Sequence, residues 1–255
     1  MLSLCCLLVT VASVYAAPAE QIVGGSPAAN CEFPSIVHLT IFNQPTDNMV
    51  SLCGGTLIDS THVLTAAHCL EGHVRKVRVN IGTNDKRIRG PQTTNAIQIM
   101  SHEHYVHQPY LIQNDIAILT LSRPVREVGC VKFATMAYPG ETFDHKRCIA
   151  AGWGNLFFKG NSPNELYKVA LPAIPHAVCK RRSRMRIVDG ILCAGDFRPG
   201  GASTCQGDSG GPLYCPRSNG EMVLAGVTSF GHKCERHISA FSDVGYFRNW
   251  IDRHT

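Results

Sequence analysis

Residues 204–215 read TCQGDSGGPLYC, a stretch that places an acid, a serine and three glycines between two cysteines. Glycines around a serine allow a tight turn and a close approach of the backbone to another group. A glycine-rich turn is the simplest structural explanation of Ser209, and a nucleophile is the functional one. A serine hydroxyl reacts only when a neighbouring base removes its proton, so further groups are needed.

Two other fragments contain such groups. In LTAAHC, an apolar strand ends at His68, and Cys69 can fix the backbone beside the imidazole; in NDIAILTLS, Asp115 heads an apolar strand. Taken singly, His68 is more readily structural and Asp115 more readily a turn or cap residue. Together with Ser209 they supply the base, the orienting carboxylate and the nucleophile of acyl transfer, and the N–H groups of Gly207 and Ser209 are candidate oxyanion donors.

The elements around these residues are predicted to be β-strands. The chain has 255 residues, of which 44% are hydrophobic, enough for a substantial core. Short β-rich runs such as SIVHLTIF, VRKVRVNIG and MVLAGVTSF recur between turn residues, a pattern typical of a β-sandwich or barrel. Only the tail has helical spacing, with Val244, Phe247, Trp250 and Ile251 on one side, and it predicts a C-terminal helix.

The amino-terminal segment and the cysteines indicate an extracellular protein. Residues 2–16 are apolar, end in small residues and are too short to span a bilayer, which is typical of a secretory signal peptide. A transmembrane anchor is the weaker alternative, because no second apolar span follows. Ten of the twelve cysteines lie beyond this segment, an even number that favours five disulfides over free thiols or zinc sites. We expect a secreted protein without a membrane anchor.

The motifs resemble those of the chymotrypsin-fold serine proteases. The matching stretches are IVGG at 22–25, LTAAHC at 64–69, NDIAIL at 114–119, GWG at 152–154 and GDSGGP at 207–212. The order His, Asp, Ser matches as well, and the resemblance covers residues 22–255. It implies an all-β fold of two packed six-stranded antiparallel β-barrels with a C-terminal α-helix.

The resemblance also divides the chain. With the signal peptide at 1–16, cleaved after Ala16 or Ala17, it implies a short activation propeptide at 17–21 and a protease domain at 22–255. Within that domain it implies an N-terminal barrel over about 22–130, a C-terminal barrel over about 131–242 and a terminal helix over about 243–254.

The activity that the resemblance implies is that of a serine endopeptidase working through an acyl-enzyme. His68, Asp115 and Ser209 would be catalytic, and Gly207 and Ser209 would form the oxyanion hole. The chain would be a zymogen cleaved before Ile22, whose new amino terminus pairs with Asp208. Gln21 stands where many relatives carry Lys or Arg, which disfavours a trypsin-like activator. The rival class is a binding protein of the same fold that has lost catalysis.

By the same resemblance, Ser203 is the floor of the primary specificity pocket, where a neutral hydroxyl cannot compensate a buried Lys or Arg. Gly231 leaves the pocket wall open to a sizeable side chain, whereas Ser239 would narrow it. The other predicted lining and substrate-edge residues are Thr204, Gln206, Ser229 and Phe230. We expect cleavage after Phe, Tyr, Leu or Met, with a smaller, elastase-like preference as the alternative.

The resemblance implies a set of disulfides. The pairs are Cys53–Cys69, Cys148–Cys215, Cys179–Cys193 and Cys205–Cys234, which leaves Cys31 with Cys130. No cofactor is expected. The histidines His102, His104 and His107 could hold an inhibitory metal, but an ordinary exposed loop is the simpler interpretation. The segment at 80–90 contains no glutamate, so no calcium site is predicted and no metal is expected.

Charge suggests one further partner. The formal net charge is +5, and the run KRRSRMR at 180–186 concentrates positive charge. Such a run is usually a solvated face, yet it is also a candidate site for heparin-like polyanions. The residues concerned are Lys180, Arg181, Arg182, Arg184 and Arg186. The other expected partners are protein or peptide substrates and protein inhibitors, and the protein is expected to be a monomer.

Overall fold

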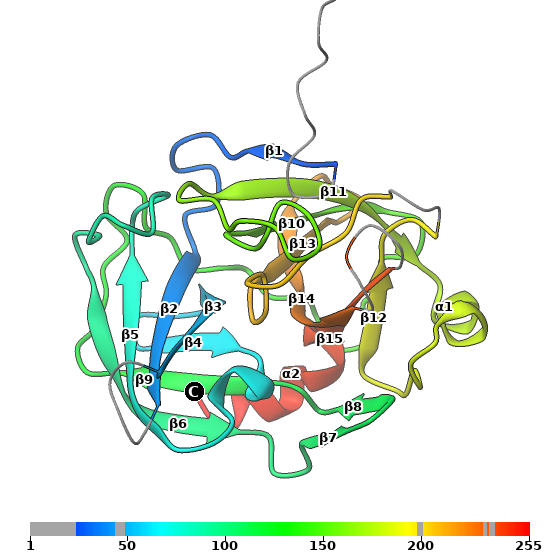
Figure 1. The fold of residues 1–255 in the computed structure, drawn as a ribbon, viewed down its shortest axis with the longest axis horizontal. Helices are drawn as coiled ribbons and strands as arrows, with labels where there is room; N and C mark the ends of the chain where they lie inside the picture. Colours follow the sequence, from blue (N-terminus) through cyan, green and yellow to red (C-terminus); the bar gives the residue numbers. More distant parts are fainter. Residues whose placement is uncertain (1–23, 44–48, 198–200, 232–233, 235–237) are drawn as a thin grey trace, which may run out of the picture.

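The computed structural model describes residues 24–43, 49–197, 201–231, 234 and 238–255. The predicted signal peptide, the propeptide and Ile22 lie outside these residues. Figure 1 shows two β-rich halves side by side, the first formed mainly by the blue-to-green part of the chain and the second mainly by the yellow-green-to-red part. In the part of the chain that the structure describes, no helix is long and apolar enough to cross a membrane.

The first half is a closed antiparallel barrel of six strands. Their spatial order is β2 (Ile36–Asn43), β3 (Met49–Leu57), β4 (His62–Thr65), β9 (Ala117–Leu121), β6 (Thr94–Ser101) and β5 (Val74–Ile81). Alternate residues face the interior, as the period of two in a strand requires. In β5, for example, Val77 and Val79 are buried, whereas Lys76 and Arg78 are exposed. The outer face of β5 is therefore polar.

The second half is also a six-stranded antiparallel barrel. Its order is β11 (Tyr167–Ile174), β10 (Arg147–Gly152), β13 (Pro212–Pro216), β14 (Met222–Gly231), β15 (Ser239–Asp243) and β12 (Ile191–Ala194), and β12 pairs back with β11. The expectation of two six-stranded barrels is confirmed. The short strand β1 (Ser26–Pro27) adds to β11, so the start of the described chain lies against the second barrel rather than within the first.

The C-terminal helix α2 (Val244–Asp252) follows β15, lies against β14 and β15 of the second barrel and reaches the residues just after β6 of the first. Asp243 caps it by accepting a hydrogen bond from the Tyr246 N–H. Trp250 Nε1 donates to Glu103 Oε2 at 2.8 Å, and its ring stacks on His102 with centroids 5.0 Å apart. The helix therefore latches the end of the second barrel onto the first, and the predicted C-terminal helix is confirmed.

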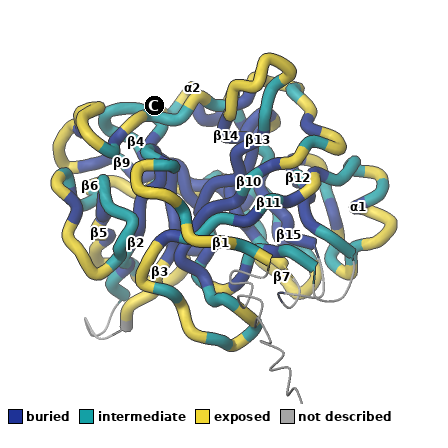
Figure 2. Tube along the Cα trace, turned by 90° about the horizontal axis from the view of Figure 1, so that it is seen from above, coloured by how far each residue is buried: buried dark blue, intermediate teal, exposed yellow. Residues whose placement is uncertain are grey.

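Apolar contacts and aromatic groups join the two barrels. The core of the first barrel continues into Trp153 and Tyr214 of the second, and Tyr214 stacks on Phe33 at 5.7 Å. Trp153 Nε1 donates to the backbone carbonyl of Asn84 at 2.7 Å. Figure 2 shows the buried segments gathered in the interior, with exposed residues on the outer loops and on α1 (His176–Arg182). The barrels thus form one packed body with a fixed junction.

Candidate active site

His68 and Asp115 are brought together by neighbouring strands of the first barrel. His68 lies in a short 3₁₀ helix, η1 (Ala67–Leu70), just after β4, and Asp115 lies just before β9. β4 and β9 are hydrogen-bonded to each other, with Thr65 opposite Ala117. As a result, the His68 N–H donates to Asp115 Oδ1 at 2.8 Å, and His68 Nδ1 lies 2.7 Å from Asp115 Oδ2. This contact makes Nδ1 the donor and leaves Nε2 as the basic nitrogen.

The second barrel completes the surroundings of Asp115. The Asp115 side chain is fully buried, with 0% of its surface exposed. Ser229 Oγ, on β14, donates to Asp115 Oδ2, and Ser242 Oγ, on β15, donates to the Asp115 backbone carbonyl at 2.6 Å. Burial raises the pKa of Asp115, but the hydrogen bond and charge of His68 and the Ser229 hydroxyl outweigh it and lower the pKa. An ionised carboxylate is thus held at the barrel junction.

The same contact tunes the imidazole. Burial favours neutral His68, yet the hydrogen bond and charge of Asp115, together with the charge of Glu71, outweigh burial and raise the pKa of His68. The His68 side chain keeps 19% of its surface exposed. It is therefore reachable from a cavity and has a strengthened affinity for a proton, which suits a general base.

Ser209 sits in a turn that only glycine can build. Gly207 has φ +99° and Gly210 has φ +74°, backbone angles that residues with a Cβ atom rarely adopt. The Gly54 N–H, on β3, donates to the Ser209 carbonyl at 2.7 Å. A Cβ on Gly54 would lie 2.7 Å from the Gly211 Cα, so the first barrel touches this turn through bare backbone. The turn is therefore positioned by both barrels.

His68 and Ser209 line one cavity of about 270 Å³. In the described chain the Ser209 hydroxyl and His68 line the same cavity, but no hydrogen bond joins them. Of the residues predicted for the specificity pocket and substrate edge, five also line this cavity. They are Thr204, Gln206, Ser229, Phe230 and Gly231. The structure thus gathers most of the predicted set around the serine and the histidine.

Ser203 and Ser239 are not among the described lining residues. Each has only 1% of its surface exposed. The Ser239 hydroxyl accepts hydrogen bonds from the Thr204 N–H at 2.9 Å and from Thr204 Oγ1 at 2.8 Å. These bonds hold the buried Ser239 side chain against Thr204, which lines the cavity, and a narrowing effect of Ser239 stays a prediction.

Sequence reasoning missed the hairpin that closes the other side of the cavity. Strands β7 (Val106–Gln108) and β8 (Leu111–Gln113) pair with each other and contribute His107 and Ile112 to the lining. His107 Nδ1 lies 2.8 Å from Glu71 Oε1, which also accepts from the Tyr105 hydroxyl at 2.7 Å. The alternation in VHQPYLIQ indicates a hairpin, but nothing in it tells which way the hairpin folds.

The histidines considered for a metal face different partners. His102 stacks on Trp250, whereas His107 contacts Glu71. Among the described residues, no group of three His, Cys, Asp or Glu side chains is placed to hold a metal ion.

Asp208 is buried beneath the serine turn. Its Oδ1 accepts from the Gly154 N–H at 2.8 Å, and its Oδ2 accepts from the Cys205 N–H at 2.9 Å. Burial, opposed only in part by these two hydrogen bonds, raises the pKa of Asp208 to about 6. A Cβ on Gly152 or Gly154 would lie within 2.6 Å of the carboxylate, which explains the glycines of the GWG motif. The predicted partner, Ile22, lies outside the described residues.

Five disulfides are present among the described residues, and they are the pairs that the resemblance implies. They are Cys31–Cys130, Cys53–Cys69, Cys148–Cys215, Cys179–Cys193 and Cys205–Cys234. Cys53–Cys69 ties the residue after His68 to β3, and Cys205–Cys234 lies in the cavity wall. The bonds therefore brace both sides of the site.

The basic segment predicted as a polyanion site lies on and after α1. Lys180, Arg181 and Arg182 occupy the last turn of this helix, where positive charge stabilises the helix dipole. The Arg182 guanidinium lies over the Phe197 ring, 3.8 Å from its centroid. Part of this charge thus has a structural role.

A double β-barrel that holds a buried aspartate, a histidine and a glycine-flanked serine around one cavity defines a chymotrypsin-like serine protease. The family model described as Trypsin matches residues 22–251, and the chain belongs to this family of serine proteases.

Proteins similar in sequence to this chain are also serine proteases. The chain is 33% identical over 264 residues to the human (Homo sapiens) chymotrypsin-like elastase family member 3B, covering 96% of this chain and 94% of that protein. It is 36% identical over 234 residues to the venom serine protease Bi-VSP of Bombus ignitus, covering 84% and 62%. Against transmembrane protease serine 9 of Rattus norvegicus, at 33% identity, it covers 91% of this chain but only 21% of the relative. The chain thus spans nearly all of the elastase and only part of the other two.

Proposed function

We propose that this protein is a secreted serine endopeptidase that cleaves peptide bonds through a covalent acyl-enzyme. The observation that carries the proposal is that the buried Asp115 carboxylate lies 2.7 Å from His68 Nδ1, and that His68 shares a cavity with Ser209. As the Ser209 Oγ attacks the carbonyl carbon, its proton passes to His68 Nε2, and Asp115 stabilises the resulting imidazolium.

The two halves of the reaction use the same proton carrier. When the C–N bond breaks, His68 gives its proton to the leaving amine, and an ester with Ser209 remains. Water then attacks this ester with His68 as base, which releases the acid and restores the serine. The N–H groups of Gly207 and Ser209 have no acceptor within the described chain, which supports their role as donors to the oxyanion.

The preferred residue before the scissile bond is apolar or aromatic in this proposal. None of the described residues that line the cavity is acidic, so a buried Lys or Arg would find no counter-charge. Phe230 gives the cavity an apolar wall, and Gly231, which has no side chain, leaves room for a sizeable substrate side chain. The elastase-like preference for a smaller side chain remains the alternative, and the similarity to elastase family member 3B is compatible with it.

Activation by cleavage before Ile22 belongs to the same proposal. Asp208 is a buried carboxylate held by backbone N–H groups alone among the described residues, so a positive charge beside it would stabilise it. The proposed processing removes a signal peptide at 1–16 and a propeptide at 17–21, and the five disulfides suit a secreted protein.

A panel of peptides that differ only in the residue before the scissile bond tests the proposal. We expect protein beginning at Ile22 to cleave after Phe, Tyr, Leu or Met fastest, and the Ser209→Ala variant to cleave none. Fastest cleavage after Ala or Val would select the elastase-like alternative. Fastest cleavage after Arg, or no cleavage by correctly processed protein, would overturn the specificity or favour the non-catalytic binding class.

A further inference from the structure

A second cavity, of about 600 Å³, lies on the outer face of the first barrel and shares no lining residue with the active-site cavity. Strand pairing creates its floor. Thr40 on β2 lies opposite Arg78 on β5, which in turn lies opposite Asn95 on β6. Because outward side chains of paired strands share a face, these polar residues form one surface. We call this cavity the outer-barrel pocket.

One buried asparagine fixes the loop that forms the rim of the outer-barrel pocket. Asn80 Nδ2 donates to the Ile88 carbonyl at 2.9 Å, and Asn80 Oδ1 accepts from the Gly90 N–H at 2.8 Å and from Thr93 Oγ1 at 2.6 Å. A Cβ at position 90 would lie 1.9 Å from the Ile81 carbonyl oxygen, so only glycine lets the loop lie this close to β5. The loop is therefore held in place before any ligand arrives.

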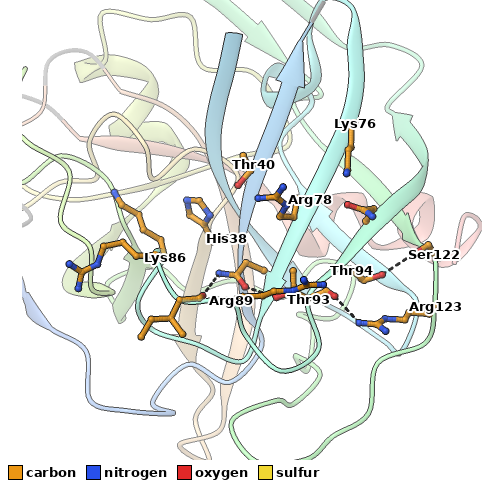
Figure 3. Close-up of a pocket in the computed structure, with 14 residues that line it drawn as sticks. His38, Thr40, Lys76, Arg78, Lys86, Arg89, Thr93, Thr94, Ser122 and Arg123 are labelled. Carbon is orange, nitrogen blue, oxygen red and sulfur yellow. Dashed lines mark hydrogen bonds between the residues drawn. The ribbon is translucent and has the colours of Figure 1, made fainter. Parts of the chain in front are cut away.

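Six of the fourteen described residues that line the pocket are cationic, and none is acidic. They are Lys76, Arg78, Lys86, Arg87, Arg89 and Arg123. Figure 3 shows the labelled cations spread around the hollow, from Lys86 on one side to Arg123 on the other. Such a surface concentrates anions.

Most of this charge is not neutralised within the described chain. Only Arg87 has a carboxylate partner there, Asp85 at 2.6 Å. Arg123 donates to the Thr93 carbonyl at 2.8 Å, and Arg78 lies over the Phe42 ring at 5.2 Å, contacts that leave their charge uncompensated. The buried His38 at the inner end is neutral, because burial and the charge of Lys86 lower its pKa to about 4.

We infer that the outer-barrel pocket binds a sulfated polysaccharide chain. Guanidinium and ammonium groups pair with sulfates, while hydroxyls and amides on the floor, such as Thr93, Thr94 and Asn95, can bond to sugar hydroxyls. Ile88 is the one apolar side chain of the described lining, whereas an acidic peptide would call for more apolar contact to anchor its side chains. The polar lining favours the glycan.

This assignment differs from the one suggested by the run at 180–186. There the cations follow one another along an exposed helix end and the segment after it, and the small cavity beside them, of about 20 Å³, has mostly apolar walls. In the outer-barrel pocket they converge from β5, the following loop and Arg123 upon one concave surface. Convergent charges can act on one ligand at the same time, so this pocket is the stronger site.

Binding of fluorescent heparin octasaccharide to full-length Ser209→Ala protein tests the inference independently of catalysis. Two variants remove equal charge: Lys76→Gln with Arg78→Gln in the pocket, and Arg181→Gln with Arg184→Gln in the basic segment. All four side chains are exposed, so thermal unfolding should stay unchanged. We expect the pocket variant to bind at least about tenfold more weakly and with a shallower salt dependence. The segment variant should change binding less than about threefold.

Three outcomes would overturn the inference. The first is a segment variant that loses as much affinity as the pocket variant or more. The second is a parent protein that binds desulfated heparin as well as heparin. The third is tighter binding of a polyglutamate peptide of equal charge, which would assign the pocket to an acidic protein partner instead.

Discussion

The active-site cavity and the outer-barrel pocket use charge in opposite ways. In the active site, the Asp115 carboxylate is fully buried and accepts three hydrogen bonds, from the His68 N–H, from His68 Nδ1 and from Ser229. In the outer-barrel pocket, Lys76 and Arg89 are exposed and have no partner among the described residues. A charge that is fixed and paired inside the protein can stabilise a transient proton on His68. A charge left open to solvent can only attract a ligand that brings its own counter-charge.

The largest expected effect comes from the paired charge. Asp115→Asn keeps the shape of the side chain but removes its negative charge, so the imidazole loses its preferred tautomer. We expect kcat to fall by about 10⁴-fold, the cost of this change in related triads. Heparin binding should stay within about twofold, because the substitution leaves the outer-barrel pocket untouched. A loss of heparin affinity together with kcat would show that the two sites are not separate.

The second effect concerns Asp208 in the uncut chain. Its pKa of about 6 exceeds the ordinary value of 3.8, so the folded state holds a proton that the unfolded state has lost between these values. The contribution of this group to stability is therefore full below about pH 4 and is lost as the pH rises through 6. The expected total is about 3 kcal/mol.

Urea unfolding of uncut Ser209→Ala protein from pH 4 to 7.5, with and without Asp208→Asn, measures this contribution. The difference between the two proteins should change across the window, with the aspartate protein losing relative stability as the pH rises. Equal pH dependence in both would contradict the proposed environment of Asp208. After cleavage before Ile22, pairing with the new ammonium should reverse the direction.

A smaller effect is expected in the acid limb of the pH profile. His68 must be neutral to accept a proton, and its raised pKa places the midpoint of kcat/KM above the ordinary imidazole value of 6.5. Glu71→Gln removes one of the charges that raise this pKa, so the midpoint should move down and activity at pH 6 should increase. An unchanged midpoint with normal folding would show that Glu71 does not act on His68.

The smallest effect on catalysis is expected from the exposed cations of the outer-barrel pocket. The Lys76→Gln, Arg78→Gln variant should hydrolyse a small uncharged peptide with kcat/KM within about twofold of the parent, because surface charges away from the cleft contribute little. A tenfold loss would mean that the pocket also shapes the catalytic cleft.

Sequence reasoning works best where function demands particular residue types. Glycines around Ser209, the cysteine after His68 and the apolar strand after Asp115 are visible in the sequence. The structure places His68 and Ser209 on one cavity and buries Asp115 against His68. The strand runs likewise predict a β-sandwich or barrel and the amphipathic tail predicts a C-terminal helix, whereas the arrangement in two barrels is what the family resemblance implies. These features depend on neighbouring residues or on a repeated spacing, so the pattern of residue types along one sequence predicts them.

The sequence does not carry features that depend on register or on side-chain direction. The hydrogen bonds that Thr204 donates to the Ser239 hydroxyl depend on how β15 is positioned in the barrel, which no spacing reveals. The outer-barrel pocket joins Arg78 and Arg123, residues far apart in the chain that a loop and a strand face bring together. The cations at 180–186 are adjacent in the sequence, so the sequence alone predicts that cluster and not the one that forms in space.

Stoichiometric labelling by an organophosphate fluoride tests the central claim most directly. Such reagents trap a serine only when a base activates it and an oxyanion site accepts the phosphoryl oxygen. Protein beginning at Ile22 should take up about one label per chain, located on Ser209 by mass spectrometry, and Asp115→Asn should slow the reaction sharply. Correctly processed, folded protein that stays unlabelled, or carries its label on another residue, would contradict the claim.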